Sequence, residues 1–153
     1  MADIEKSYEP LRKRHNLPPF KEIDEEFEIS TIESDKFLLR EIRKKIYEKI
    51  EDAGHILEDI LQPDANISVM YEARVFDDDE KKDIFNLYRK MMYWKRMFNE
   101  AYVANSEQMD AELINTVFSS WKDIKKEMSS LIRKLRDSWL EDVDTKTDLP
   151  YFG

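Results

Sequence analysis

The sequence predicts an all-α protein, an antiparallel helical bundle of three long helices plus a short N-terminal helical segment. Apolar residues return every three or four positions along three long stretches, which is the period of a helix and not of a strand. The chain of 153 residues contains only two glycines, which excludes most tight hairpin turns. A chain of this length also buries enough surface for one domain with a real core. We therefore expect a single helical-bundle domain over residues 1–141.

Residues 8–29 are expected to form a helical clasp that packs on the bundle. A short helix from Ser7 to His15 should stop at Pro18 and Pro19, because proline lacks a backbone donor and pushes the preceding residue toward extended geometry. A second short helix should then begin at Phe20. Its apolar residues recur at helical spacing: Phe20, Ile23, Phe27 and Ile29.

The first long helix is expected over 31–62. Ser30 and Glu33 form a capping-box pattern, Ser34 offers an alternative cap, and Pro63 ends the helix. The apolar seam consists of Leu39, Ile42, Ile46, Ile50, Ala53, Ile56 or Leu57, and Ile60. After it, residues 67–76 form either a short helix capped by Asn66 or a partly extended connection, and the short helix is favoured.

The second long helix is expected over 79–104, because Asp77 and Glu80 form another capping box. Its first apolar row contains Ile84, Leu87, Met91, Trp94, Phe98 and Ala101. A second row beside it contains Phe85, Tyr88, Met92 and Tyr102. Together the two rows are wider than a usual apolar stripe, so the helix should contact neighbours on two sides. We predict that the second row binds a protein partner or a second copy of the chain.

The third long helix is expected over 106–141. Its seam alternates steps of three and four residues, as in a coiled coil: Met109 or Asp110, Ile114, Val117, Trp121, Ile124, Met128, Leu131, Leu135, and Ser138 or Trp139. Because the other two long helices offer matching seams, we assign this ladder to the core of the chain.

One face of the 79–104 helix is basic, although the chain has a net charge of −9. Lys82, Arg89 and Arg96 recur every seven residues, and Tyr93 lies in the same stripe. Such a face can bind phosphates and stack an unpaired base, which makes an RNA- or ribosome-associated protein the alternative function. The other interpretation is a solvated face that pairs with the acidic first long helix.

The sequence favours a protein that is not an enzyme and has no cofactor. The absence of cysteine excludes thiol nucleophiles, disulfides and thiolate metal sites. Asp52 and His55 form an Asp-x-x-His, but a bundle di-iron site needs four carboxylates and two Glu-x-x-His motifs. His15 is the only other histidine, and we expect no buried carboxylate on the seams of the other long helices. We therefore assign no catalytic residue, no metal ligand and no small-molecule substrate.

Residues 142–153 lack a helical period and are expected to form a flexible tail. Leu149, Tyr151 and Phe152 within it suggest either a docking peptide or a segment that folds back on the bundle. The spacing of Lys146, Leu149 and Phe152 resembles that of sliding-clamp-binding peptides, with Lys in place of their glutamine and Gly153 in place of a second aromatic residue. The ending Tyr151-Phe152-Gly153 resembles the hydrophobic-tyrosine-any ending of proteasome activators, with Phe at the tyrosine position.

The expected location is cytoplasmic. The first thirty residues contain many charges and no apolar run, so we expect neither a signal peptide nor a membrane anchor. No apolar stretch approaches the roughly 20 residues that span a bilayer. The sequence as a whole favours a helical protein–protein interaction module, such as an adaptor, scaffold or assembly factor.

Overall fold

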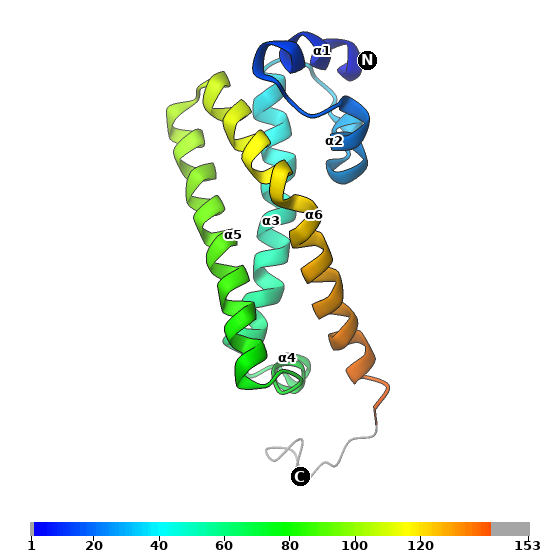
Figure 1. Cartoon of the computed structure of the whole chain (residues 1–153), viewed down its shortest axis with the longest axis vertical. Helices are drawn as coiled ribbons and strands as arrows, with labels where there is room; N and C mark the ends of the chain where they lie inside the picture. The colour runs from blue at the N-terminus through cyan, green and yellow to red at the C-terminus, as the bar shows by residue number, and fades with distance from the viewer. Residues whose placement is uncertain (1, 142–153) are drawn as a thin grey trace. The chain divides into compact units, whose positions relative to one another are not determined.

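The computed structural model describes residues 2–141, and their regular structure is helical throughout. These residues contain no strand, so the predicted all-α helical bundle is confirmed. Figure 1 traces the elements along the chain. In order they are α1 (Ile4–His15), α2 (Phe20–Phe27), the 3-10 turn η1 (Ile29–Thr31), α3 (Leu38–Leu61), α4 (Ile67–Ala73), α5 (Asp78–Ala104) and α6 (Glu107–Ser138).

The chain divides into two compact units, and each of the three long helices contributes to both. Of the described residues, unit 1 contains 2–52 and 91–122, and unit 2 contains 53–90 and 123–141. Unit 1 therefore holds α1, α2 and η1, whereas unit 2 holds α4 (Figure 1).

The N-terminal segment of unit 1 forms two short helices separated by the predicted proline break. Helix α1 begins at Ile4 because the Asp3 carboxylate accepts a hydrogen bond of 3.1 Å from the backbone N–H of Lys6. It ends at His15, and the following residue, Asn16, has a left-handed φ of 52° that turns the chain. Of the expected packing residues, Ile23, Phe27 and Ile29 are buried, and Phe20 is half-buried.

The predicted start of the first long helix is wrong. Helix α3 begins at Leu38, and Ser30 lies in the 3-10 turn η1. The backbone N–H of Ser30 donates to the Asp24 carboxylate at 2.7 Å, so the Ser30–Glu33 capping box does not form. The hydroxyl of Ser34 accepts from Lys36 N–H at 3.2 Å, a local turn that competes with a helix start.

The other two predicted start signals are confirmed. Asn66 caps α4 by accepting from the N–H of Ser68 at 3.0 Å. At the start of α5, the N–H of Glu80 donates to the Asp77 carboxylate at 2.8 Å, and the N–H of Asp77 donates to the Glu80 carboxylate at 3.2 Å. This reciprocal pair is the expected capping box, and it satisfies two donors at the helix end.

The seam of α6 is buried largely as predicted. Ile114, Val117 and Trp121 lie in the core of unit 1, and Ile124, Met128 and Leu135 lie in the core of unit 2. Asp110, and not Met109, supplies the buried first step, while Leu131 is half-buried. The helix ends at Ser138 and not at 141. From Trp139 to Glu141 the backbone bonds reach only three residues back, which is the 3-10 pattern that often closes a helix.

Candidate interaction surfaces

The two predicted apolar rows of α5 differ sharply in burial. The first row is buried throughout: Ile84, Leu87, Met91, Trp94, Phe98 and Ala101. In the second row, Phe85 is 50% exposed and Tyr102 is 74% exposed, whereas Tyr88 and Met92 are half-buried. Phe85 and Tyr88 are three residues apart, so they share one side of the helix within unit 2. We call these two residues the α5 flank.

The predicted partner-binding residues do not form one cluster. Phe85 and Tyr88 belong to unit 2, while Met92 and Tyr102 belong to unit 1. Tyr102 lies in the last turn of α5, ten residues beyond Met92. The tail residues of the same prediction, Leu149, Tyr151 and Phe152, lie outside the described residues.

All four residues of the basic stripe, Lys82, Arg89, Tyr93 and Arg96, are exposed on α5. Tyr93 is 67% exposed, which leaves its ring open for stacking. Arg96 donates to the side-chain oxygen of Asn99 on the same helix at 2.9 Å. Within residues 2–141, neither Lys82 nor Arg89 forms an ion pair with the acidic side chains of α3.

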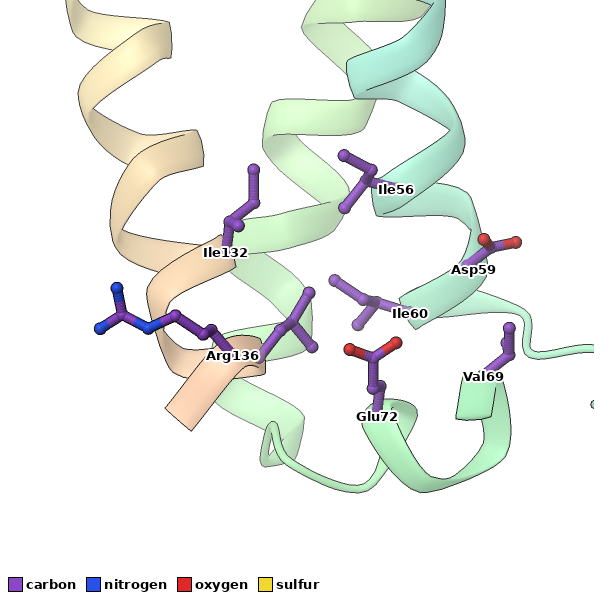
Figure 2. A pocket seen from close by; sticks show the side chains of 8 residues that line it. Ile56, Asp59, Ile60, Val69, Glu72, Ile132 and Arg136 are labelled. Carbon is purple, nitrogen blue, oxygen red and sulfur yellow. The ribbon is translucent and has the colours of Figure 1, made fainter. Parts of the chain in front are cut away.

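Unit 2 contains an apolar pocket of about 290 Å³ between α3, α4 and α6. Figure 2 shows Ile56 and Ile60 of α3 facing Ile132 of α6 across this pocket. The Glu72 carboxylate points toward the same space from α4, whereas the guanidinium of Arg136 is directed away from it (Figure 2). The complete lining is Ile56, Asp59, Ile60, Val69, Glu72, Ile132, Leu135 and Arg136, which we call the α3–α4–α6 pocket.

Helix α4 holds the C-terminal end of α6 beside this pocket. The Tyr71 hydroxyl donates to the carbonyl of Ser138 at 2.6 Å, and the Tyr71 ring lies 4.4 Å from the ring of Trp139. The indole N–H of Trp139 donates to the Glu72 carboxylate at 3.1 Å. Trp139 nevertheless remains 50% exposed and Leu140 is 87% exposed, so apolar surface continues past the end of the helix.

A second hollow of unit 2, the α5–α6 groove, has a volume of about 930 Å³ and a charged rim. Its floor includes Ile84, Leu87 and Leu131, and its rim includes Glu80 and Lys134. Lys134 forms an ion pair with Glu80 across the groove, and its ammonium lies 5.1 Å from the ring centre of Phe76.

The interior of unit 1 contains a buried ion pair that the sequence analysis did not predict. We expected no buried carboxylate on this seam, but Asp110 is only 3% exposed. The Arg43 guanidinium donates to the Asp110 carboxylate at 2.5 Å and to the carbonyl of Ala101 at 3.0 Å. Burial raises the pKa of Asp110 above its ordinary value, and the charge of Arg43 opposes this rise. The pair joins α3 to α5 and α6 and has the surroundings of a structural contact.

A second polar cluster fastens the N-terminal helices of unit 1 to α6. The Glu107 carboxylate is 2.8 Å from the His15 ring nitrogen Nε2 and 3.0 Å from the Arg14 guanidinium. The hydrogen bond from His15, followed by the contact with Arg14, holds the pKa of Glu107 below its usual value. The side-chain amide of Asn115 also donates to the carbonyl of His15 at 3.2 Å. These contacts explain why the end of α1 lies against the first turns of α6.

Sequence reasoning missed the α3–α4–α6 pocket. Ile56 was an alternative seam residue, and Ile132 lies next to the seam residue Leu131. Ile132, Arg136 and Trp139 follow each other at helical spacing, and this weak second row was the available signal. The short helix α4 decides whether that row is covered, and its position cannot be read from periodicity.

Within residues 2–141, no helix combines the length and apolar composition that crossing a bilayer requires. The same part of the chain contains no group of three or more histidine, aspartate or glutamate side chains placed to hold a metal ion. Comparison of the chain with protein-family models, curated proteins and solved structures found no match.

Proposed function

We propose that the protein is a non-enzymatic helical interaction module, an adaptor, scaffold or assembly factor, that associates through the α5 flank. The observation that carries this proposal is Phe85, a large aromatic side chain of unit 2 that is half exposed, with half-buried Tyr88 three residues further along the same helix. Aromatic residues supply much of the binding energy of protein interfaces, and an apolar strip on a helix can pack against its own copy about a two-fold axis. We infer that the first partner is a second copy of the chain.

Light scattering across a concentration series tests this self-association. Replacement of Phe85→Glu should weaken the dimer more than tenfold, because a symmetric interface loses the aromatic contact twice. The matched control is Ile67→Glu, which changes a similarly exposed apolar residue of α4 outside the flank. A chain that stays monomeric at all concentrations, and that retrieves no partner sensitive to Phe85→Glu, contradicts the proposal.

We also propose that the tail acts as a docking peptide, with Leu149, Tyr151 and Phe152 as its apolar contacts. Support comes from its chemistry alone, because three apolar side chains follow the polar residues 144–148. Pull-downs with the full chain and with Leu149→Ser/Phe152→Ser should differ in the partners they retain. Identical sets of retained proteins would remove the tail from the proposal.

An RNA- or ribosome-associated function is the second candidate, and the exposure of all four residues of the basic stripe favours it. Binding to a single-stranded RNA oligomer should then weaken steeply between 50 and 200 mM salt, as expected when about three phosphates are contacted. Arg89→Glu/Arg96→Glu should abolish binding, while Arg133→Glu, an exposed position on α6, should weaken it slightly. Binding that is absent or independent of salt would exclude this candidate.

A further inference from the structure

In unit 1, the α3 and α6 helices are bridged by α2. Lys49 of α3 donates to the backbone carbonyl of Glu26 at 2.6 Å, and Trp121 of α6 donates to the Glu26 carboxylate at 2.7 Å. The ring of Phe27 packs 5.2 Å from that of Trp121. A short amphipathic segment with an aromatic anchor thus covers these two helices in unit 1.

In unit 2, the same two helices leave the α3–α4–α6 pocket open. Its walls are apolar, and Ile132 in the wall is 41% exposed. The carboxylates of Asp59 and Glu72 also line it, while Arg136 donates to the carboxylate of Asp137 at 2.8 Å. A suitable occupant therefore presents apolar or aromatic side chains together with a cation.

The chain itself carries such a segment close by. Helix α4 holds Ser138 and Trp139 beside the pocket, and residues 142–153 follow directly. Leu149 lies eight residues beyond Glu141, and eight extended residues span about 26–29 Å. The distance along α6 from Ser138 back to Ile132 is only about 9 Å. The tail is therefore long enough to return to the pocket.

We propose that the segment Leu149 to Phe152 of the chain's own tail occupies the α3–α4–α6 pocket, with Lys146 near the carboxylates of Asp59 and Glu72. The apolar side chains match the isoleucine walls, and the lysine complements the acidic rim. A partner that captures the tail must then first displace it from this seat. This placement of the tail goes beyond the proposed self-association, which uses the α5 flank. Either proposal can fail while the other holds.

Disulfide trapping in the full chain tests this seat, because the natural sequence contains no cysteine. Asp59→Cys/Pro150→Cys places one thiol at the pocket rim and one between the tail anchors, and leaves the apolar contacts intact. A disulfide requires Cα atoms within about 4.4–6.8 Å of each other. Under mild oxidation we expect a cross-linked monomer at a yield at least fivefold above that of Asp83→Cys/Pro150→Cys, which tests the rim of the α5–α6 groove instead.

Equal yields for the two pairs would overturn the proposal. So would a disulfide found only in dimers, since it would mean that the tail seats on a second copy. Hydrogen exchange supplies an independent readout, because loss of the tail anchors should uncover the pocket. Leu149→Ser/Tyr151→Ser/Phe152→Ser should speed exchange of the α4 amides severalfold and leave α1 unchanged. Unchanged exchange in α4 would contradict the proposed seat.

Discussion

Units 1 and 2 are built on the same three long helices, but they place their charges differently. Unit 1 buries a charged pair, Arg43 and Asp110, at its centre. In unit 2, charged side chains such as Glu72 and Lys134 lie at the rims of the hollows. A buried charge must keep its partner, so it holds neighbouring helices in one arrangement, whereas rim charges leave an apolar space that can accept another segment. Unit 1 therefore fixes the arrangement of its helices, whereas unit 2 offers surface for binding.

The two tryptophans of α6 present the same contrast on a smaller scale. Trp121 in unit 1 and Trp139 in unit 2 each donate an indole N–H to a carboxylate, Glu26 and Glu72 respectively. Trp121 is 4% exposed, whereas Trp139 is 50% exposed. The same hydrogen bond therefore accompanies a packed core residue in one unit and a half-open surface in the other.

The largest effect should come from breaking the buried pair of unit 1. Arg43→Met leaves the Asp110 carboxylate buried without its partner, which costs about 3–5 kcal/mol in the free energy of unfolding. Urea denaturation followed by circular dichroism measures this loss of stability. The charge of Arg43 now lowers the pKa of Asp110, so its loss raises that pKa further. An acid with a raised folded-state pKa is stabilised by protonation, so the defect should shrink as the pH falls.

Two variants serve as controls for the buried pair. Lys44→Met removes an exposed cation paired with Glu41 and should change the stability by less than about 0.5 kcal/mol. Arg43→Met/Asp110→Leu removes both charges and should recover most of the loss. A double variant no more stable than Arg43→Met alone would mean that the guanidinium acts mainly through the Ala101 carbonyl.

An intermediate effect is expected for the difference in stability between variants of the two tryptophans. Trp121→Ala opens a cavity in unit 1 and should cost about 3–5 kcal/mol. Trp139→Ala removes a half-exposed ring and one hydrogen bond, so about 1 kcal/mol is expected. Thermal unfolding of the two variants measures how much stability each one loses. Equal destabilisation would show that the end of α6 is as tightly packed as its middle.

The smallest effect should come from the contact between α1 and α6. Because the folded-state pKa of Glu107 is lowered, its ionised form stabilises unit 1 above the ordinary carboxylate pKa, and this stabilisation is lost as the pH falls through the lowered value. The side chain is 49% exposed, so screening limits the loss in Glu107→Gln to about 0.5 kcal/mol at pH 7. Urea titrations at pH 7 and pH 3 measure the difference between wild type and variant. A difference that persists undiminished at pH 3 would assign the effect to packing.

Sequence reasoning predicted most of the fold because its signals are local. The Asp77–Glu80 capping box and the Asn66 cap were read correctly, since each involves residues only two or three positions apart. The Ser30–Glu33 box has the same pattern but does not form, because Asp24, six residues earlier, binds the N–H of Ser30. A competing contact of that kind lies outside the span of the pattern.

In the candidate surfaces, too, only the features that depend on neighbouring residues could be predicted. Periodicity alone placed Phe85 and Tyr88 on one side of a helix, which follows from the geometry of any α-helix. It could not place α4 against Trp139, pair Arg43 with Asp110, or show that Ile56 and Ile132 face an open pocket. Helix identity and helix faces depend on neighbours along the chain, so the order of residues suffices for them. Burial, charge pairing and open space depend on which distant segment covers each face, and packing in three dimensions decides that.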